Sequence, residues 1–90
     1  MYEIQASTKF RRDLKKLTRQ QKPIEKLKGI IQLLENGEPL PKRNRDHLLT
    51  GNWHQYRECH IEPDWLLIYR INDEEKILEL VRTGSHSELF

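Results

Sequence analysis

Residues 65–71 form a nearly continuous apolar run, Trp65-Leu66-Leu67-Ile68-Tyr69-Arg70-Ile71. A turn containing Pro63 precedes the run, and the polar turn Asn72-Asp73-Glu74-Glu75 follows it. A short apolar run bounded by turns is typical of a central strand that is covered on both faces. We therefore predict that residues 65–71 form the central strand of a sheet.

Two further strands are predicted beside this run. Residues 53–61 form one of them, and residues 76–83 form the other. Side chains alternate between the two faces of a strand. The first face of residues 53–61 then carries Tyr56, Glu58 and His60, and the second carries Arg57, Cys59 and Ile61. The connections are short, so these strands must be antiparallel neighbours.

The first half of the chain predicts one strand and two helices. Residues 2–5 have strand character, although periodicity does not fix their neighbour in the sheet. Ser7 or Thr8 can cap a helix whose apolar stripe is Phe10, Leu14 and Leu17. A second amphipathic helix begins near Pro23 and ends at Asn36-Gly37. Its stripe is Ile24, Leu27, Ile30, Ile31 and Leu34.

This order predicts a two-layer α+β fold, β-α-α-β-β-β, in a single domain that spans residues 1–90. The two N-terminal helices pack on one face of a mainly antiparallel sheet. Ser85 can cap a short C-terminal helical turn that carries His86 and Phe90. The loop at residues 38–52 is long for so small a domain, and such loops are usually functional.

Composition limits the class of protein. The chain is 36% hydrophobic and 33% charged, with a mean hydropathy of -0.87. It has no apolar run near the 18 residues that a membrane span needs, and no signal peptide is expected. The single cysteine cannot form an internal disulfide, so a cytoplasmic location is expected.

The net charge of +2 conceals an asymmetry. Residues 9–45 contain twelve basic and four acidic side chains, whereas residues 46–90 contain four basic and nine acidic ones. A basic half can bind a polyanion such as nucleic acid, or an acidic protein. The alternative is a solvated helix surface, which charge alone favours about two to one.

Several side chains near the strand ends can perform acid/base chemistry, because histidine exchanges protons near neutral pH. A hairpin return brings Asp64 and Trp65 close to His60, and Glu58 shares the face of His60. A carboxylate can orient an imidazole. The alternative is a half-exposed strand histidine beside a turn-forming aspartate.

The second group comes from the chain end and the loop. His86 and Arg82 flank the end of the last strand, where Arg82 can bind a phosphate or pair with Glu79 or Glu58. His47 lies in the loop and can equally be a solvated residue. Aromatic rings can stack on an RNA base. Trp65 and Phe90 are the candidates here, and each can instead belong to the core.

Other chemistries have weaker support. No cysteine or histidine pair has zinc-site spacing and no glycine-rich phosphate loop is present, so neither a metal nor another cofactor is expected. Cys59 faces away from Glu58 and His60 and is predicted to be a small buried hydrophobe rather than a nucleophile.

The chain resembles the YafQ branch of the RelE/ParE toxin superfamily. Three blocks carry the resemblance, residues 46–53, 56–69 and 82–90, and the predicted strand-helix-helix-three-strand order also matches that fold. The resemblance implies a toxin of a type II toxin–antitoxin pair that acts as an mRNA endonuclease on the ribosome. The family's catalytic set corresponds to His47, His60, Asp64 and His86, and its supporting aromatics to Trp65 and Phe90. Glu58 stands where some members have aspartate.

The resemblance also implies partners. An acidic antitoxin would wrap and inactivate the toxin, and DNA would be bound only through that complex. The basic helices over Lys9–Lys28 suit both this antitoxin and ribosomal RNA. Two rival functions remain open: a ParE-like gyrase poison with the same fold, and a non-catalytic nucleic-acid-binding module. The set of histidines argues against the gyrase poison, which does not need them.

Overall fold

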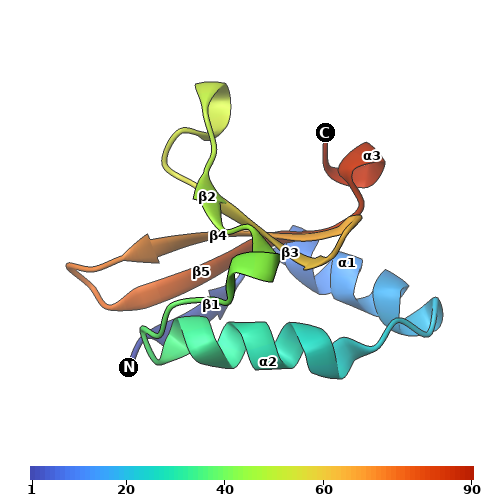
Figure 1. Ribbon diagram of the computed structural model, residues 1–90, viewed down its shortest axis with the longest axis horizontal. Helices are drawn as coiled ribbons and strands as arrows, with labels where there is room; N and C mark the ends of the chain where they lie inside the picture. The colour runs from blue at the N-terminus through green and yellow to red at the C-terminus, as the bar shows by residue number, and fades with distance from the viewer.

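A five-stranded sheet organises the computed structural model, which describes residues 1–90 (Figure 1). The strand order is β1-β5-β4-β3-β2, and only the β1–β5 pair is parallel. The strands are β1 (Glu3–Ala6), β2 (His47–Leu48), β3 (Arg57–Glu62), β4 (Trp65–Asn72) and β5 (Ile77–Gly84). The predicted α+β class with a mainly antiparallel sheet is confirmed, and β5 proves to be the neighbour of the first strand.

The apolar run at residues 65–71 forms β4, which lies between β5 and β3. Its residues from Trp65 to Tyr69 are all buried, because alternate side chains enter different clusters. Leu67 and Tyr69 pack toward the two long helices, whereas Leu66 and Ile68 pack with Leu89 on the other face. The prediction that this strand is covered on both sides is confirmed.

Two helices cover one face of the sheet (Figure 1). Helix α1 (Thr8–Arg19) begins at Ser7, whose hydroxyl accepts a hydrogen bond from the Phe10 N–H at 2.9 Å. Helix α2 (Ile24–Glu35) ends before Gly37, which adopts a positive φ of 71°. Their buried residues are Phe10, Leu17, Leu27, Ile30 and Leu34, which all belong to the predicted stripes. None of the helices has the length and apolar character needed to span a bilayer.

The loop at residues 38–52 contains structure that the sequence did not predict. It holds a 3₁₀ turn, η1 (Lys42–Asn44), and the two-residue strand β2. A second 3₁₀ turn, η2 (Gly51–Trp53), follows, so β3 begins at Arg57 rather than at Trp53. Two residues are too few to show alternation, which is why β2 left no pattern in the sequence.

The opposite face of the sheet carries the short helix α3 (His86–Leu89) and the loop between β2 and β3 (Figure 1). Ser85 caps α3 as predicted: its hydroxyl accepts from the Glu88 N–H, and the Glu88 carboxylate accepts from the Ser85 N–H. This reciprocal arrangement satisfies two backbone donors that a helix start leaves free. Helix α3 therefore places His86 above the sheet.

Candidate active site

Two rows of paired residues cross the sheet on the α3 side. The first row is His47, Glu58, Ile68 and Arg82, and the second is His60, Leu66 and Gly84. Leu66 and Ile68 contact Leu89 of α3. Because side chains at paired positions share a face, Glu58 and His60 point toward α3. The predicted common face of these two residues is confirmed.

Glu58 occupies the centre of the histidine cluster. Its side chain is buried, with 4% of the residue exposed. One carboxylate oxygen, Oε1, lies 3.5 Å from Nε2 of His60 and 3.8 Å from Nε2 of His86. A buried carboxylate needs charged or donating partners, and here imidazoles from β3 and α3 supply them. The ring centroids of His60 and His86 are 6.0 Å apart.

The hydrogen bonding of His60 fixes its orientation. Its Nδ1 lies 3.0 Å from the carbonyl oxygen of Pro63, which can only accept, so Nδ1 carries a proton. Nε2 then faces Glu58. His60 is 9% exposed, so its ring has little freedom to turn. This arrangement directs one ring nitrogen into the cluster.

Asp64 contacts His86 rather than His60. Its Oδ1 accepts a hydrogen bond from the His86 backbone N–H at 3.1 Å and lies 3.4 Å from Nδ1 of the same residue. The sequence predicted that Asp64 lies beside His60, but its neighbouring imidazole is that of His86. One carboxylate oxygen positions both the main chain and the ring of His86.

The expectation that Trp65 lies near His60 is wrong. A register shift between His60 and Glu62 places His60 opposite Leu66, so Trp65 points to the other face. Trp65 is 1% exposed within the helix-side core, and its indole N–H donates to the Thr83 hydroxyl at 2.9 Å. Its ring has no free face on which a base can stack.

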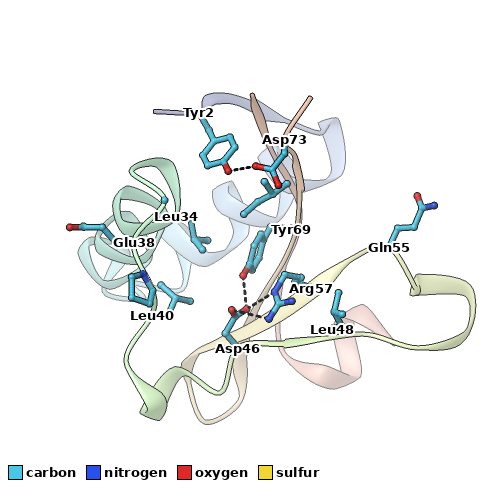
Figure 2. Close-up of a pocket in the computed structure, with 13 residues that line it drawn as sticks. Tyr2, Leu34, Glu38, Leu40, Asp46, Leu48, Gln55, Arg57, Tyr69 and Asp73 are labelled. Carbon is cyan, nitrogen blue, oxygen red and sulfur yellow. Dashed lines mark hydrogen bonds and ion pairs between the residues drawn. The ribbon is translucent and has the colours of Figure 1, made fainter. Parts of the chain in front are cut away.

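His47 lies at the exposed edge of the cluster on β2, directly opposite Glu58 in the strand pairing. Its Nδ1 lies 2.7 Å from the carbonyl oxygen of Arg45. The neighbouring residue Asp46 anchors this short strand. Asp46 accepts hydrogen bonds from Arg57, at 3.2 and 3.3 Å, and from the hydroxyl of Tyr69 (Figure 2).

The Asp46 anchor lines a cavity of about 510 Å³ on the helix side of the sheet (Figure 2). Burial and the adjacent Asp46 carboxylate raise the pKa of the Tyr69 hydroxyl, so the hydroxyl remains a donor. The contacts of Asp46 with Arg57 and Tyr69 therefore fix the strand that carries His47, although the His47 ring itself is exposed.

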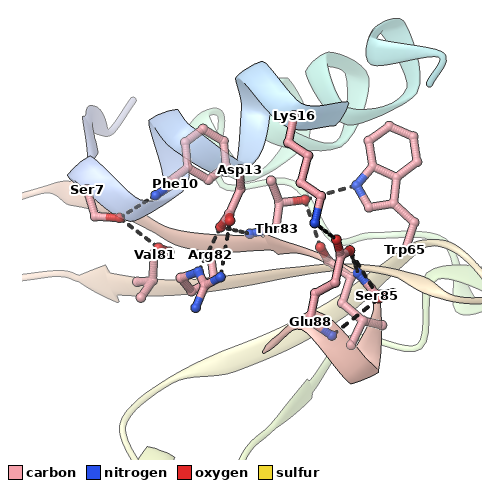
Figure 3. A network of polar contacts seen from close by, with 11 residues as sticks. Ser7, Phe10, Asp13, Lys16, Trp65, Val81, Arg82, Thr83, Ser85 and Glu88 are labelled. Atoms are coloured by element: carbon pink, nitrogen blue, oxygen red, sulfur yellow. Dashed lines mark hydrogen bonds and ion pairs between the residues drawn. The ribbon is translucent and has the colours of Figure 1, made fainter. Parts of the chain in front are cut away.

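Arg82 does not pair with Glu79 or Glu58, the partners considered from the sequence. Asp13 of α1 binds its guanidinium through two hydrogen bonds of 2.7 and 3.1 Å (Figure 3). Glu79 pairs instead with Arg70. Asp13 also accepts from the Thr83 N–H, and it raises the pKa of Arg82. Arg82 therefore joins α1 to the end of β5.

The aromatic side chains near His86 include one that the sequence analysis missed. Phe90 is 57% exposed, and its ring centroid lies 6.1 Å from that of His86. Trp53 of η2 stands edge-on to Phe90, with ring centroids 5.9 Å apart. The alternation pattern placed Trp53 inside a strand. The preceding Gly51, which adopts a positive φ, was the available sign of a turn.

The predicted burial of Cys59 is confirmed. The residue is fully buried in the helix-side core, on the face opposite Glu58 and His60. Burial raises the pKa of its thiol to about 12. A thiol of this kind does not supply the thiolate that nucleophilic catalysis needs. In the structure, no group of three or more His, Cys, Asp or Glu side chains is arranged to hold a metal ion.

Comparison with known proteins identifies close relatives. A family model for the bacterial toxin of a type II toxin–antitoxin system, YafQ, matches residues 2–90. A protein from Escherichia coli strain K12 named mRNA interferase toxin YafQ is 43% identical over 89 residues, covering 98% of this chain and 95% of that protein.

Two solved structures have the same fold. A chain of the E. coli DinJ–YafQ complex has a TM-score of 0.90 at 42% identity, and the match covers 100% of this chain and 99% of that one. A metal-bound toxin from Helicobacter pylori has a TM-score of 0.95 at 43% identity, with both chains fully covered. The likeness extends over the whole chain, including every strand and helix that supplies the histidine cluster.

Proposed function

This chain belongs to the YafQ family of type II toxin–antitoxin toxins, and we propose that it is an endoribonuclease that cleaves mRNA. The observation that carries the proposal is the placement of His60 and His86 around the buried carboxylate of Glu58. The ring centroids of the two imidazoles are 6.0 Å apart, close enough for both rings to act on one phosphodiester. Such a pair can supply both a base and an acid to one reacting group.

The proposed reaction uses the RNA's own 2′-hydroxyl. One imidazole removes its proton, O2′ forms a bond to phosphorus, and the bond from phosphorus to O5′ breaks. The other imidazole gives a proton to the departing O5′, which leaves a 2′,3′-cyclic phosphate and a 5′-hydroxyl. His60 and His86 share these two roles, and His47 assists or binds the phosphate.

The surrounding side chains hold the imidazoles and supply charge. Glu58 orients the Nε2 atoms of His60 and His86, and Asp64 orients Nδ1 of His86. Arg82 adds positive charge near the phosphate, although direct contact requires Asp13 to release it. The H. pylori relative is described as metal-bound. In this chain, no group of three or more His, Cys, Asp or Glu side chains is arranged to hold a metal ion, and the proposed reaction assigns the proton transfers to the histidines.

Partners follow from the charge distribution and the relatives. The E. coli relative is solved with DinJ, and we expect a cognate acidic antitoxin for this chain. The exposed basic residues of α1 and α2, within Lys9–Lys28, suit both that antitoxin and ribosomal RNA. The site of action is then translated mRNA in the cytoplasm, and DNA is contacted only through the antitoxin complex.

A cleavage assay with the purified chain and translating ribosomes tests the proposal. His60→Ala and His86→Ala should each lower the cleavage rate by about a hundredfold to ten-thousandfold, the range for loss of a general acid or base. His54→Ala is the matched control, because His54 is an exposed histidine outside the cluster. Full cleavage by the His86 variant would remove His86 from the mechanism.

Expression in cells separates the rival functions. Growth arrest that is lost with His60→Ala supports the nuclease. Arrest that survives all histidine changes and is accompanied by DNA damage supports a gyrase poison. A chain without any effect on growth supports a binding module.

A further inference from the structure

Five aromatic rings form a continuous row across the α3 side of the sheet. In order they are Tyr56, Trp53, Phe90, His86 and His60, with successive centroids 5.4, 5.9, 6.1 and 6.0 Å apart. The last two rings belong to the proposed catalytic cluster. Phe90 is already a candidate for stacking on a base, whereas Trp53 and Tyr56 have no role assigned so far, yet their rings continue directly from the cluster.

We propose that Trp53 and Phe90 form a nucleobase-binding subsite next to the scissile phosphate. The proposal rests on the proposed function, because it takes the ligand to be single-stranded RNA. The base adjoining the cleaved bond stacks on the exposed ring of Phe90, and Trp53 completes the platform. Trp53, and not the buried Trp65, is the second ring of this subsite.

The exposure of the rings supports a ligand rather than simple packing. Phe90 is 57% exposed, so a large apolar surface faces solvent beside polar catalytic groups. Every nucleobase offers a flat π-face, so stacking on an aromatic ring tolerates any sequence. RNA-binding proteins commonly hold splayed bases in this way. A phosphate between His60 and His86 brings its neighbouring base within reach of Phe90.

The platform is held rigidly. Within the loop, the Tyr56 N–H donates to the Trp53 carbonyl at 2.8 Å and the Leu49 N–H donates to the Tyr56 carbonyl at 2.9 Å. At the far end of the row, the Arg70 guanidinium lies 5.7 Å from the Tyr56 ring centroid. Glu79 fixes Arg70 through two hydrogen bonds. A preorganised ring loses less entropy when a base stacks on it.

Trp53 also packs against the small cluster of Leu66, Ile68 and Leu89, so its loss can affect folding. Trp53→Leu retains an apolar side chain for that cluster but removes the ring. Trp53→Phe retains a ring and removes the indole. These two variants separate stacking from packing, and Tyr2→Phe, far away beside Asp73, is the control.

Binding is measured with a short 2′-O-methyl RNA, which lacks the attacking hydroxyl. A matched set of strands carries one abasic site, moved along the strand from one oligonucleotide to the next. The tryptophan fluorescence of wild type should be quenched when RNA binds, because a base stacks near Trp53. The fluorescence of Trp53→Phe should not change, because its only tryptophan, Trp65, is buried. Trp53→Leu and Phe90→Leu should each bind the complete strand about tenfold or more weakly, as expected for one lost stack.

The abasic strands identify the contact. In wild type, one abasic position should weaken binding by about the same factor, and that position should have no further effect in Phe90→Leu, which lacks the ring on which the base stacks. Equal losses in wild type and Phe90→Leu at every abasic position would overturn the subsite. If wild type binds in this way but fails to cleave mRNA on translating ribosomes, the nuclease proposal fails while the subsite stands.

Discussion

Glu58 is the residue on which the cluster depends most, because its buried carboxylate faces both proposed catalytic imidazoles. Glu58→Gln keeps the shape of the side chain and removes the charge. A neutral amide does not attract a protonated imidazole as the carboxylate does, so His60 and His86 lose the charge that holds them in position. We expect the maximal cleavage rate to fall about a hundredfold, with KM little changed.

The control for this prediction is stability. Glu58→Gln should unfold at about the temperature of wild type or above it, because a neutral amide is less costly to bury than a carboxylate. Glu58→Asp tests whether the distance from the carboxylate to the two rings matters, since the shorter side chain moves the charge away from them. A Glu58→Gln variant that cleaves at the wild-type rate would reduce Glu58 to a packed strand residue.

At the scale of elements, α3 is fastened to α1 by the side chain of Glu88 (Figure 3). One carboxylate oxygen accepts from the Ser85 N–H, and the other pairs with Lys16. Both contacts lower the pKa of Glu88 to about 2. The group therefore stabilises α3 fully above about pH 4.5, its ordinary value, and this stabilisation is lost as the pH falls toward 2.

Three variants separate the cap from the ion pair. Glu88→Gln can still accept from Ser85, Lys16→Met removes only the ion pair, and Glu88→Ala removes both. Hydrogen exchange at residues 85–90 should accelerate most in Glu88→Ala, by about fivefold for a lost cap worth roughly 1 kcal/mol. Its cleavage rate should fall because His86 lies on α3. Equal exchange in all three variants and wild type would show that the Glu88 side chain does not stabilise the helix.

The elements that the sequence predicted are those with long periodic patterns. The stripes of α1 and α2 and the apolar run of β4 each extend over seven residues or more, so few other secondary structures fit these patterns.

The two-residue strand β2 and the partner of β1 depend on long-range pairing, which leaves no local pattern in the sequence. The bulge between His60 and Glu62 inserts a single extra residue into β3, and it moves Trp65 to the face opposite His60. Trp53 was missed for a related reason, because a 3₁₀ turn replaced the expected start of β3.

At the scale of the whole molecule, the basic and acidic halves of the chain occupy different elements. The exposed surface of α1 carries basic residues with no ion-pair partner in the structure, among them Arg12 and Lys15, whereas the neighbouring Lys16 is paired with Glu88. The proposed catalytic cluster lies on the opposite side of the sheet, with α3 (Figure 1). The molecule can therefore hold a long RNA through one surface and cleave it at another.

Salt dependence tests this division. Each phosphate contact on a single strand adds about 0.7 to the slope of log affinity against log salt. Arg12→Gln combined with Lys15→Gln should therefore reduce the slope by up to about 1.4 for a long single-stranded RNA, and should leave the rate at saturating RNA unchanged. Lys76→Gln, in the distant turn before β5, is the control with one charge removed elsewhere. An unchanged slope would mean that RNA phosphates do not contact Arg12 and Lys15. The basic surface of α1 would then bind the acidic antitoxin and not RNA.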